Sequence, residues 1–303
     1  MRFELFIALR YLFSRRKHGF ISAISLISVI GVALGVAALI IVLGVMNGFS
    51  QNLRDKILGV NAHVLVTSLQ GPFSGYQKHS EKVRDLSGVK GVLPFVYAEV
   101  MLSSPDGAKG VMLRGIQPDT AARVLSLKED MVRGELRDLQ KDRELPGIIV
   151  GDELAGNLGL RPGDTAHMMS PSGEKGTAGF NPKIMNFRIV GVFDTGMYEY
   201  DSSLAYSSIS AAQRIMGFED DLVTGLEVRL KDIYAAPEMA KRIESTLSQG
   251  FFSARTWMEM NQELFSALKL EKTAMGVILA LMVMVGSFSI VTTLIMLVME
   301  KKQ

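Results

Sequence analysis

Two long runs of apolar residues without a single charge stand near the two ends of the sequence, at residues 19–51 and 273–299. An α-helix rises about 1.5 Å per residue, so roughly 20 apolar residues cross the hydrocarbon core of a bilayer. Both runs exceed that length. We therefore predict two transmembrane helices, at residues 21–48 and 273–299.

Two other interpretations of the first run are weaker. A cleaved signal peptide has an apolar core of only about 7 to 15 residues. A buried helix of a soluble protein seldom continues this far without a charge. No cysteine is present, so the run contains no lipid-attachment motif.

The helical pattern continues beyond both predicted spans, at residues 49–60 and 257–272. Apolar residues recur there every four positions, which is typical of an amphipathic helix. They are Phe49, Leu53 and Ile57 in the first stretch and Met260, Leu264 and Leu268 in the second. These stretches are predicted to be helical stalks. Their stripes either pack on one another or form the mouth of a lipid-accessible cavity.

Residues 61–256 alternate short strands with short helices, which predicts a large α+β domain. Turn motifs rich in glycine and proline separate the elements. Strands are expected at residues 62–67, 92–103, 109–115, 147–150, 187–193, 204–206, 224–230 and 252–256. Helices are expected at residues 79–86, 119–125, 152–158, 210–216 and 237–247.

Charge indicates how the chain is oriented. Five basic residues and one acidic residue precede the first span: Arg2, Arg10, Arg15, Arg16 and Lys17, with Glu4. Short basic flanks remain in the cytoplasm, whereas a loop of some 200 residues is translocated whatever its charge. Residues 1–20 are predicted to be a cytoplasmic amphipathic helix at the membrane surface, or alternatively an undocked basic tail. Residues 300–303 are then cytoplasmic, and the domain at 61–256 lies outside.

Composition limits the function. With 48% hydrophobic and 21% charged residues, the chain needs both a membrane part and a large water-facing part. A net charge of +2 argues against nucleic-acid binding, and the absence of cysteine excludes disulfides and thiolate metal sites. This composition also suits an oxidising compartment.

No catalytic or metal-binding pattern is found. The four histidines, His18, His63, His79 and His167, lack the spacing of metal ligands, and no G-x-S-x-G motif is present. Residues 173–177 superficially resemble a phosphate loop but lack its register, so a flexible hairpin tip is the better interpretation. The sequence therefore predicts no enzyme and no bound metal.

Small residues follow one face of the first span. Two G-x-x-x-G motifs occur there, formed by Gly31 with Gly35 and by Gly44 with Gly48. Small side chains let helix backbones approach closely in lipid. We predict that these four glycines mark a surface for helix packing.

Several motifs in order resemble the LolC/LolE family, the membrane subunits of lipoprotein-releasing ABC transporters, within the wider MacB and FtsX group. The resemblance covers the whole chain. The residues that carry it lie at 8–11, 28–36, 45–49, 57–59, 113–118, 151–155, 163–164 and 298–301. It implies a MacB-like periplasmic core between the two spans, with a porter part at 61–117 and 222–256 and an inserted Sabre-like part at 118–221.

The resemblance also implies partners and a mechanism. Two such subunits would pair in the bacterial inner membrane with a LolD-like ATPase dimer, which binds the ATP and Mg²⁺, so this chain itself has no cofactor. Mechanical force would then move lipoproteins from the outer leaflet of the inner membrane to a LolA-like periplasmic carrier. Family members carry a coupling helix and two further spans beyond the position where this sequence ends, so we expect the chain to be truncated.

The same resemblance indicates candidate contact residues. The lipid-modified cargo is expected to meet Met46, Phe49, Leu264, Phe265 and Leu268, although these side chains could instead pack the stalks together. The hairpin at 169–185 corresponds to the family's carrier-binding loop. Its candidate contacts are Ser170, Pro171, Phe180, Pro182 and Ile184.

Three alternatives stay open at this point. Within transport, the chain could be a MacB-like exporter or an FtsX-like regulator of cell-wall hydrolases. In another class, a span, an extracytoplasmic domain and a second span form the front half of a membrane sensor. A sensor would continue into a cytoplasmic signalling helix, whereas the transporter family continues into a coupling helix.

Overall fold

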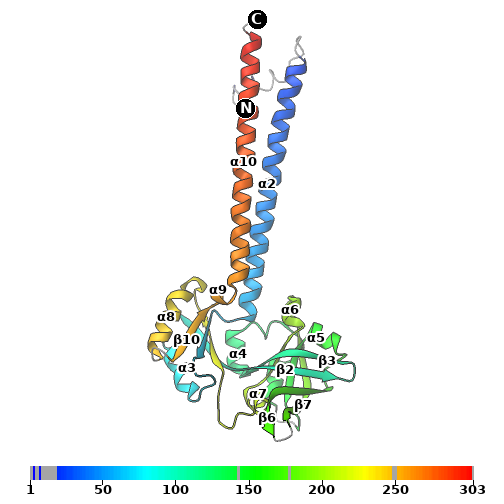
Figure 1. Cartoon of the computed structure of the whole chain (residues 1–303), viewed down its shortest axis with the longest axis vertical. Coiled ribbons are helices and arrows are strands. Elements are labelled where there is room, and N and C mark those ends of the chain that lie inside the picture. Colours follow the sequence, from blue (N-terminus) through cyan, green and yellow to red (C-terminus); the bar gives the residue numbers. More distant parts are fainter. Residues whose placement is uncertain are drawn as a thin grey trace. The chain divides into compact units, whose positions relative to one another are not determined.

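The computed structural model describes Phe3, Ile7 and residues 19–141, 144–176, 179–247 and 251–301. The chain divides into two units: one comprises Met1–Leu53 and Gln262–Gln303, and the other comprises Arg54–Asn261. The first unit is helical and the second is the α+β domain (Figure 1). The predicted helix at 1–20 and the predicted end at 300–303 lie largely outside the described residues.

Two long helices dominate the first unit. Helix α2 (Gly19–Val60) has 42 residues and α10 (Gln262–Lys301) has 40. Within the described residues, these are the two helices long and apolar enough to cross a membrane. Their candidate spans are Ile30–Val60 and Gln262–Met296, and 18-residue windows within them have mean hydropathies of 2.5 and 2.4. Helix α2 passes without a break through the span predicted at 21–48 and the stalk predicted at 49–60. The second predicted stalk is divided between α9 (Trp257–Met260) and α10.

The second unit consists of ten strands with short helices between them. Its strands are β1 (Val64–Ser68), β2 (Val89–Ser104), β3 (Gly107–Ile116), β4 (Met131–Gly134), β5 (Gly147–Gly151), β6 (Thr165–Gly176), β7 (Gly179–Phe193), β8 (Leu204–Ser208), β9 (Gly225–Leu230) and β10 (Phe252–Thr256). Its remaining helices are α3 (Tyr76–Arg84), α4 (Pro118–Val124), η1 (Leu136–Gln140), α5 (Asp152–Asn157), α6 (Tyr198–Asp201), α7 (Ile209–Met216), η2 (Ile233–Ala235) and α8 (Ala236–Thr246).

Six of the strands close into a ring. The pairing runs from β2 through β3, β8, β5, β7 and β6, and β6 pairs again with β2. Side chains alternate along each strand, so one set fills the interior of this small barrel and the other faces outward. Val96, Ala98, Val100 and Leu102 of β2 are buried in the interior, together with residues such as Met168 and Phe187.

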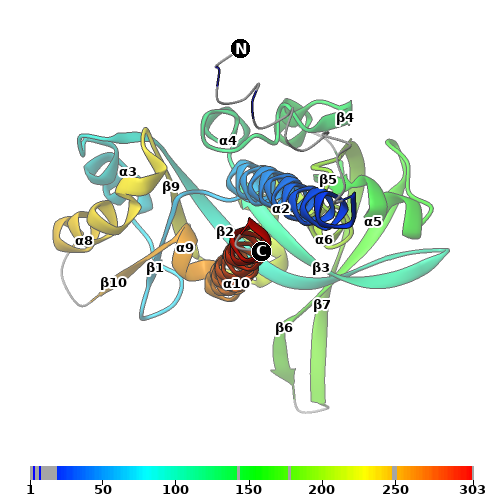
Figure 2. The same ribbon diagram turned by 90° about the horizontal axis from the view of Figure 1, so that it is seen from above.

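The other side of β2 joins a second set of strands. Its first half pairs with β9, and β1 lies between β9 and β10. Helix α3 packs on β2 and α8 packs on β10, which covers this part of the sheet (Figure 2). The 16-residue strand β2 is therefore shared by both halves of the domain. The predicted division at residues 118 and 222 into a porter part and an inserted part remains a prediction.

All eight predicted strands and all five predicted helices of the domain occur in the structure. Most ends are shifted by a few residues, whereas β7 begins at Gly179, eight residues before the predicted start. Local signals explain this agreement at α7, where the Ser208 side chain accepts a hydrogen bond from the N–H of Ala211 and Gly217 ends the helix at φ 74°. Strands β4 and β6 were not among the eight predicted strands. The four residues of β4 are mostly exposed, which leaves no apolar alternation to detect, whereas β6 was expected only as one arm of the hairpin at 169–185.

Candidate functional site

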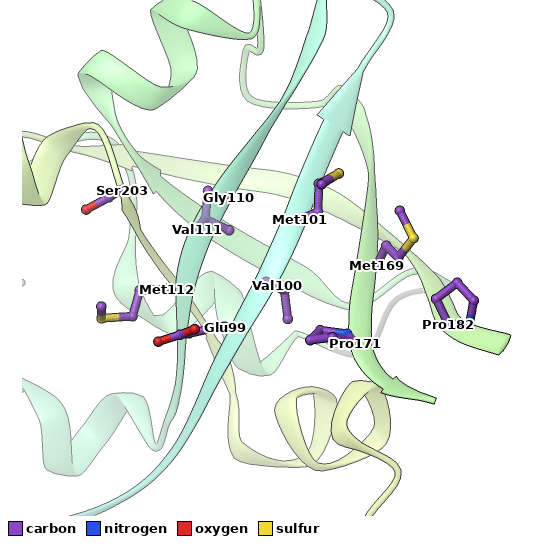
Figure 3. Close-up of a pocket in the computed structure, with 10 residues that line it drawn as sticks. All are labelled: Glu99, Val100, Met101, Gly110, Val111, Met112, Met169, Pro171, Pro182 and Ser203. Atoms are coloured by element: carbon purple, nitrogen blue, oxygen red, sulfur yellow. The ribbon is translucent and has the colours of Figure 1, made fainter. Parts of the chain in front are cut away.

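An apolar groove crosses the outer face of the barrel. It has a volume of about 640 Å³ and runs over β2, β3, β6 and β7 (Figure 3). The registers Met101↔Gly110, Met101↔Met169 and Glu99↔Met112 place these residues on the face opposite the buried core. Its lining residues are Glu99, Val100, Met101, Gly110, Val111, Met112, Met169, Pro171, Pro182 and Ser203. Flexible methionine side chains adapt to apolar ligands of varied shape.

A second cavity of about 580 Å³ adjoins the groove, since Met112 and Ser203 line both. Its lining combines apolar and polar side chains. The apolar ones include Leu65, Phe95, Leu204 and Met260, and the polar ones include Asn61, Tyr200, Arg255, Arg114 and Glu227. Asn61 directly follows α2, and Met260 lies two residues before the start of α10. The cavity is therefore lined in part by residues that connect the domain to the two long helices.

Arg114 and Glu227 form a buried ion pair in the wall of this cavity. Arg114 Nη2 donates to Glu227 Oε1, Arg114 Nη1 donates to the carbonyl oxygen of Val60 at 3.3 Å, and the guanidinium lies 5.6 Å from the centre of the Tyr206 ring. Burial raises the pKa of Glu227, and the adjacent Arg114 guanidinium opposes that rise. Burial likewise raises the pKa of Tyr206 to about 12.

The second oxygen of Glu227 differs from the first. Glu227 is only 5% exposed, and its Oε2 atom has no hydrogen-bond partner within the described part of the chain. A buried carboxylate oxygen without a partner is costly, typically by 1 to 3 kcal/mol or more for a charged group. Glu227, which lines the cavity, therefore carries one buried acceptor atom that the described residues do not use.

Two arginines hold the C-terminal end of α2. Arg114 donates to the carbonyl of Val60, and Arg229 Nη1 donates to the carbonyls of Leu58 at 3.3 Å and Val124 at 2.8 Å. The last carbonyls of a helix lack partners within the helix and carry partial negative charge, so cations stabilise them. The end of α2 is thus attached to β3 and β9 of the α+β domain.

The five predicted lipid-contacting residues lie in the helical unit. Met46, Leu264, Phe265 and Leu268 are half-buried, whereas Phe49 is 55% exposed. These positions leave all five predictions open, because half-buried side chains on such helices suit both cargo contact and helix packing.

The four predicted packing glycines differ in their surroundings. A Cβ atom added at Gly35 would lie 3.4 Å from the sulfur of Met282 in α10, and one added at Gly286 would lie 3.5 Å from Val32 in α2. Added Cβ atoms at Gly31, Gly44 and Gly48 would meet nothing within 4 Å. Within the described part of the chain, Gly35 is thus the one of the four that meets α10, although Gly31 also lines the groove of about 690 Å³ between α2 and α10.

The predicted carrier-binding hairpin is the antiparallel pair β6 and β7. Its five candidate residues are not equivalent. Pro171 and Ile184 are exposed, Pro182 is half-buried, and the side chain of Phe180 lies outside the described residues. Ser170 is fully buried, with its hydroxyl 3.9 Å from the sulfur of Met216. The prediction of Ser170 as a surface contact is therefore wrong, because the strand alternation turns it toward the core.

No cluster of three or more metal-ligating side chains occurs among the described residues. The sequence analysis missed the cavity residues Arg114 and Glu227 and the groove residues Met101, Met112 and Met169. One signal was present: Arg114 lies in the buried second half of β3, and Glu227 stands between the buried apolar residues Leu226 and Val228 of β9. A charge inside such a strand needs a partner nearby.

Comparisons with known proteins agree with this architecture. Residues 25–246 match the family model described as the MacB-like periplasmic core domain. Among solved structures, the periplasmic region of MacB from Actinobacillus actinomycetemcomitans matches with 13% identity and a TM-score of 0.44 over 69% of this chain and 94% of that one. The extracellular domain of the Gram-positive transporter YknZ has 12% identity and a TM-score of 0.43 over 64% of this chain and 99% of that one.

Curated relatives extend over the helices as well. The lipoprotein-releasing system transmembrane protein LolC of Neisseria meningitidis serogroup B is 34% identical over 99% of this chain and 71% of its own length. LolC of Xylella fastidiosa strain Temecula1 is 34% identical over 98% of this chain and 70% of its own. LolE of Haemophilus influenzae is 26% identical over the whole chain and 72% of its own.

The fold and its two flanking helices define a transmembrane protein with a MacB-like periplasmic core domain. The identity and the coverage of these relatives are specific to one group within that class. The chain belongs to the LolC/LolE family.

Proposed function

We propose that this chain is a permease subunit that extracts lipoproteins from the outer leaflet of the bacterial inner membrane and passes them to a periplasmic carrier. The observation that carries the proposal is the 34% identity to a lipoprotein-releasing LolC protein, which continues across 99% of the chain. This similarity includes both membrane-length helices, the domain and the β6–β7 hairpin, and it favours this role over an exporter, a hydrolase regulator or a sensor.

The proposal requires partners. A LolD-like ATPase dimer in the cytoplasm would bind ATP and Mg²⁺, and a second LolC/LolE-type subunit would complete the membrane part. Closure of the ATPase would act on the cargo through the long helices. Helix α2 suits this task, because it is continuous over 42 residues and its last carbonyls are held by Arg114 and Arg229 of the domain.

Two contact surfaces follow from the proposal. Met46, Phe49, Leu264, Phe265 and Leu268 would contact the acyl chains of the cargo, and Gly31, Gly35, Gly44 and Gly48 would allow close packing of helices. The exposed residues of the hairpin, Pro171 and Ile184, together with Pro182 and Phe180, would contact a LolA-like carrier. An apolar loop projecting from a strand pair is a common way to present a binding hot spot.

Reconstitution tests the proposal directly. The complete complex, containing the full-length protein, its partner subunit and the ATPase, is placed in proteoliposomes with a purified lipoprotein. We expect lipoprotein to appear in the soluble fraction only when both ATP and the carrier are present. ATP-dependent movement of another substrate, with the lipoprotein left in the membrane, would exclude this function.

A further inference from the structure

We propose that the groove and the cavity form one binding site for an amphiphile: its N–H donor binds Glu227 and its alkyl chain lies toward Met101 and Met169. This inference rests on the proposed function and deepens it. In a lipoprotein, peptide N–H groups adjoin the acyl chains, so the lipid-modified end of the cargo has the required chemistry.

Glu227 supplies the polar half of the site. Its Oε1 atom is occupied by Arg114, while its Oε2 atom is buried without a partner and the residue lines the cavity. A carboxylate oxygen accepts hydrogen bonds and cannot donate them. This oxygen is closed to solvent, so the carboxylate must turn toward the cavity to meet a ligand. An N–H donor would then satisfy the oxygen and recover the free energy lost by its burial.

Strand β3 supplies the path from the cavity to the groove. Arg114, Met112 and Gly110 are two residues apart, so they share one face of the strand and span about 13 Å. Gly110 pairs with Met101, which pairs in turn with Met169. A Cβ atom added at Gly110 would meet nothing within 4 Å, so the floor of the groove is open at this point.

The charges along the path select the class of ligand. Glu99, Glu199 and Glu227 line the two cavities, against Arg114 and Arg255, and Arg114 is already paired with Glu227. An anionic head group would meet this excess of carboxylates. A neutral amide donates a hydrogen bond and brings no negative charge, as the amides beside the acyl chains of a lipoprotein do.

Two probes that differ only in an N–H group against an oxygen atom test the site. N-hexylacetamide carries an N–H where hexyl acetate carries an ester oxygen, and their alkyl chains are identical. The full chain in lipid nanodiscs is labelled at the methionine methyl carbons, and Met101, Met112 and Met169 are assigned by single replacement with leucine. We expect both probes to shift these three NMR signals, with Kd about tenfold lower for the amide, as one hydrogen bond to a charged group provides.

The variant Glu227→Gln tests the donor site. Its side-chain oxygen takes the place beside Arg114, so an NH₂ donor replaces the free oxygen acceptor. We expect the tenfold preference for the amide to fall below about twofold. Equal binding of amide and ester by the unsubstituted protein, or an unchanged preference in Glu227→Gln, overturns the proposal.

A second variant keeps the test decisive where Glu227→Gln fails to fold. Gly110→Leu fills the open floor of the groove, and Gly156→Leu adds the same side chain in α5, where a Cβ also meets nothing within 4 Å. We expect Gly110→Leu to weaken the binding of both probes at least tenfold and Gly156→Leu to change it less than twofold.

Two outcomes contradict a binding site in the groove: NMR shifts confined to methionines of α2 and α10, or unaltered probe binding by Gly110→Leu. Failure of lipoprotein release by a complex that binds the amide as described would contradict the proposed function alone.

Discussion

His63 and Leu230 are joined by a buried hydrogen bond, in which the backbone N–H of Leu230 donates to His63 Nδ1 at 3.1 Å. The acceptor role requires a neutral imidazole, because a protonated Nδ1 is a donor. Burial, followed by the nearby Arg229 and Lys90, lowers the pKa of His63 from 6.5 to about 4. The fold therefore binds the unprotonated form of this side chain.

This depressed pKa predicts a pH dependence of stability. The contribution of His63 is complete above pH 6.5, where both the folded and the unfolded forms are neutral, and it decreases as the pH falls from 6.5 to 4 because the unfolded chain takes up the proton first. The loss amounts to at most about 3 kcal/mol. Urea denaturation followed by the fluorescence of Trp257, the one tryptophan, measures it.

The variant His63→Asn is the control for this prediction. Its amide oxygen accepts the Leu230 N–H but does not titrate. We expect the difference in unfolding free energy between the unsubstituted protein and His63→Asn to depend on pH only between about 4 and 6.5. A difference that is constant over this range would show that His63 is not the titrating group.

The ion pair between Arg114 and Glu227 makes a second prediction. Removing one partner of a buried pair leaves the other charge uncompensated, which typically costs 3 to 5 kcal/mol. Arg114→Met should therefore destabilise the domain by about this amount. The double variant Arg114→Met with Glu227→Leu should recover most of the loss. Urea denaturation measures the free energy of unfolding of each variant. Equal losses of stability in the single and double variants would contradict a stabilising interaction between Arg114 and Glu227.

The predicted cargo contacts are testable at Met46. A charge near the membrane interface costs about 1 to 3 kcal/mol by membrane scales, which disfavours an acyl chain without unfolding a helix. In the complete complex, Met46→Asp should reduce photocrosslinking to a lipid-labelled lipoprotein several-fold. The neighbouring Val45→Asp, on an exposed position, serves as the control. Equal crosslinking in both variants would favour a packing role for Met46.

The hairpin prediction concerns binding to the carrier. Replacing residues 173–181 with a short glycine-serine turn should abolish capture of a LolA-like carrier while the melting temperature changes little, since the base of the hairpin keeps its pairing with β2. The turn between β2 and β3, at residues 104–107, is replaced in the same way as the control. Carrier binding that survives the first replacement would disprove the assignment of this hairpin as the carrier-binding loop.

The contact between Gly35 and Met282 can be tested by disulfide formation, because the natural chain has no cysteine. Oxidation of the double variant Gly35→Cys with Met282→Cys should give an internal crosslink, seen as altered gel mobility that dithiothreitol reverses. Gly44→Cys with Met282→Cys should not crosslink, because an added Cβ at Gly44 meets nothing within 4 Å. Crosslinking of the Gly44 pair but not of the Gly35 pair would show that α2 is rotated about its axis, so that another face meets α10.

Much of the fold was predictable because its signals are local. Charge-free runs of sufficient length identify α2 and α10, and alternation in β2 separates Val96, Ala98, Val100 and Leu102 from the outward residues. The pair of prolines and the glycines around residues 171–182 also mark the hairpin correctly. The side chain of Ser170 was assigned to the wrong face, because its environment depends on how β6 pairs rather than on composition.

The candidate site was not predictable, since its residues meet only through non-local pairing. Arg114 and Glu227 are 113 positions apart and come from β3 and β9. Met101 and Met169 become neighbours only because β6 closes the ring against β2. Periodicity tells which face of a strand a residue occupies, but it does not tell which strand lies beside it.

The sequence by itself determined the two apolar helices, the α+β domain between them and, through its motifs, the family. These properties depend on the length of apolar runs and on periods of two and 3.6 residues, which are written along the chain. Only the tertiary structure decided that the barrel closes, that Met112 lines two cavities, and that Glu227 Oε2 has no partner among the described residues. Those outcomes depend on distances between residues far apart in sequence, which packing of the whole domain sets.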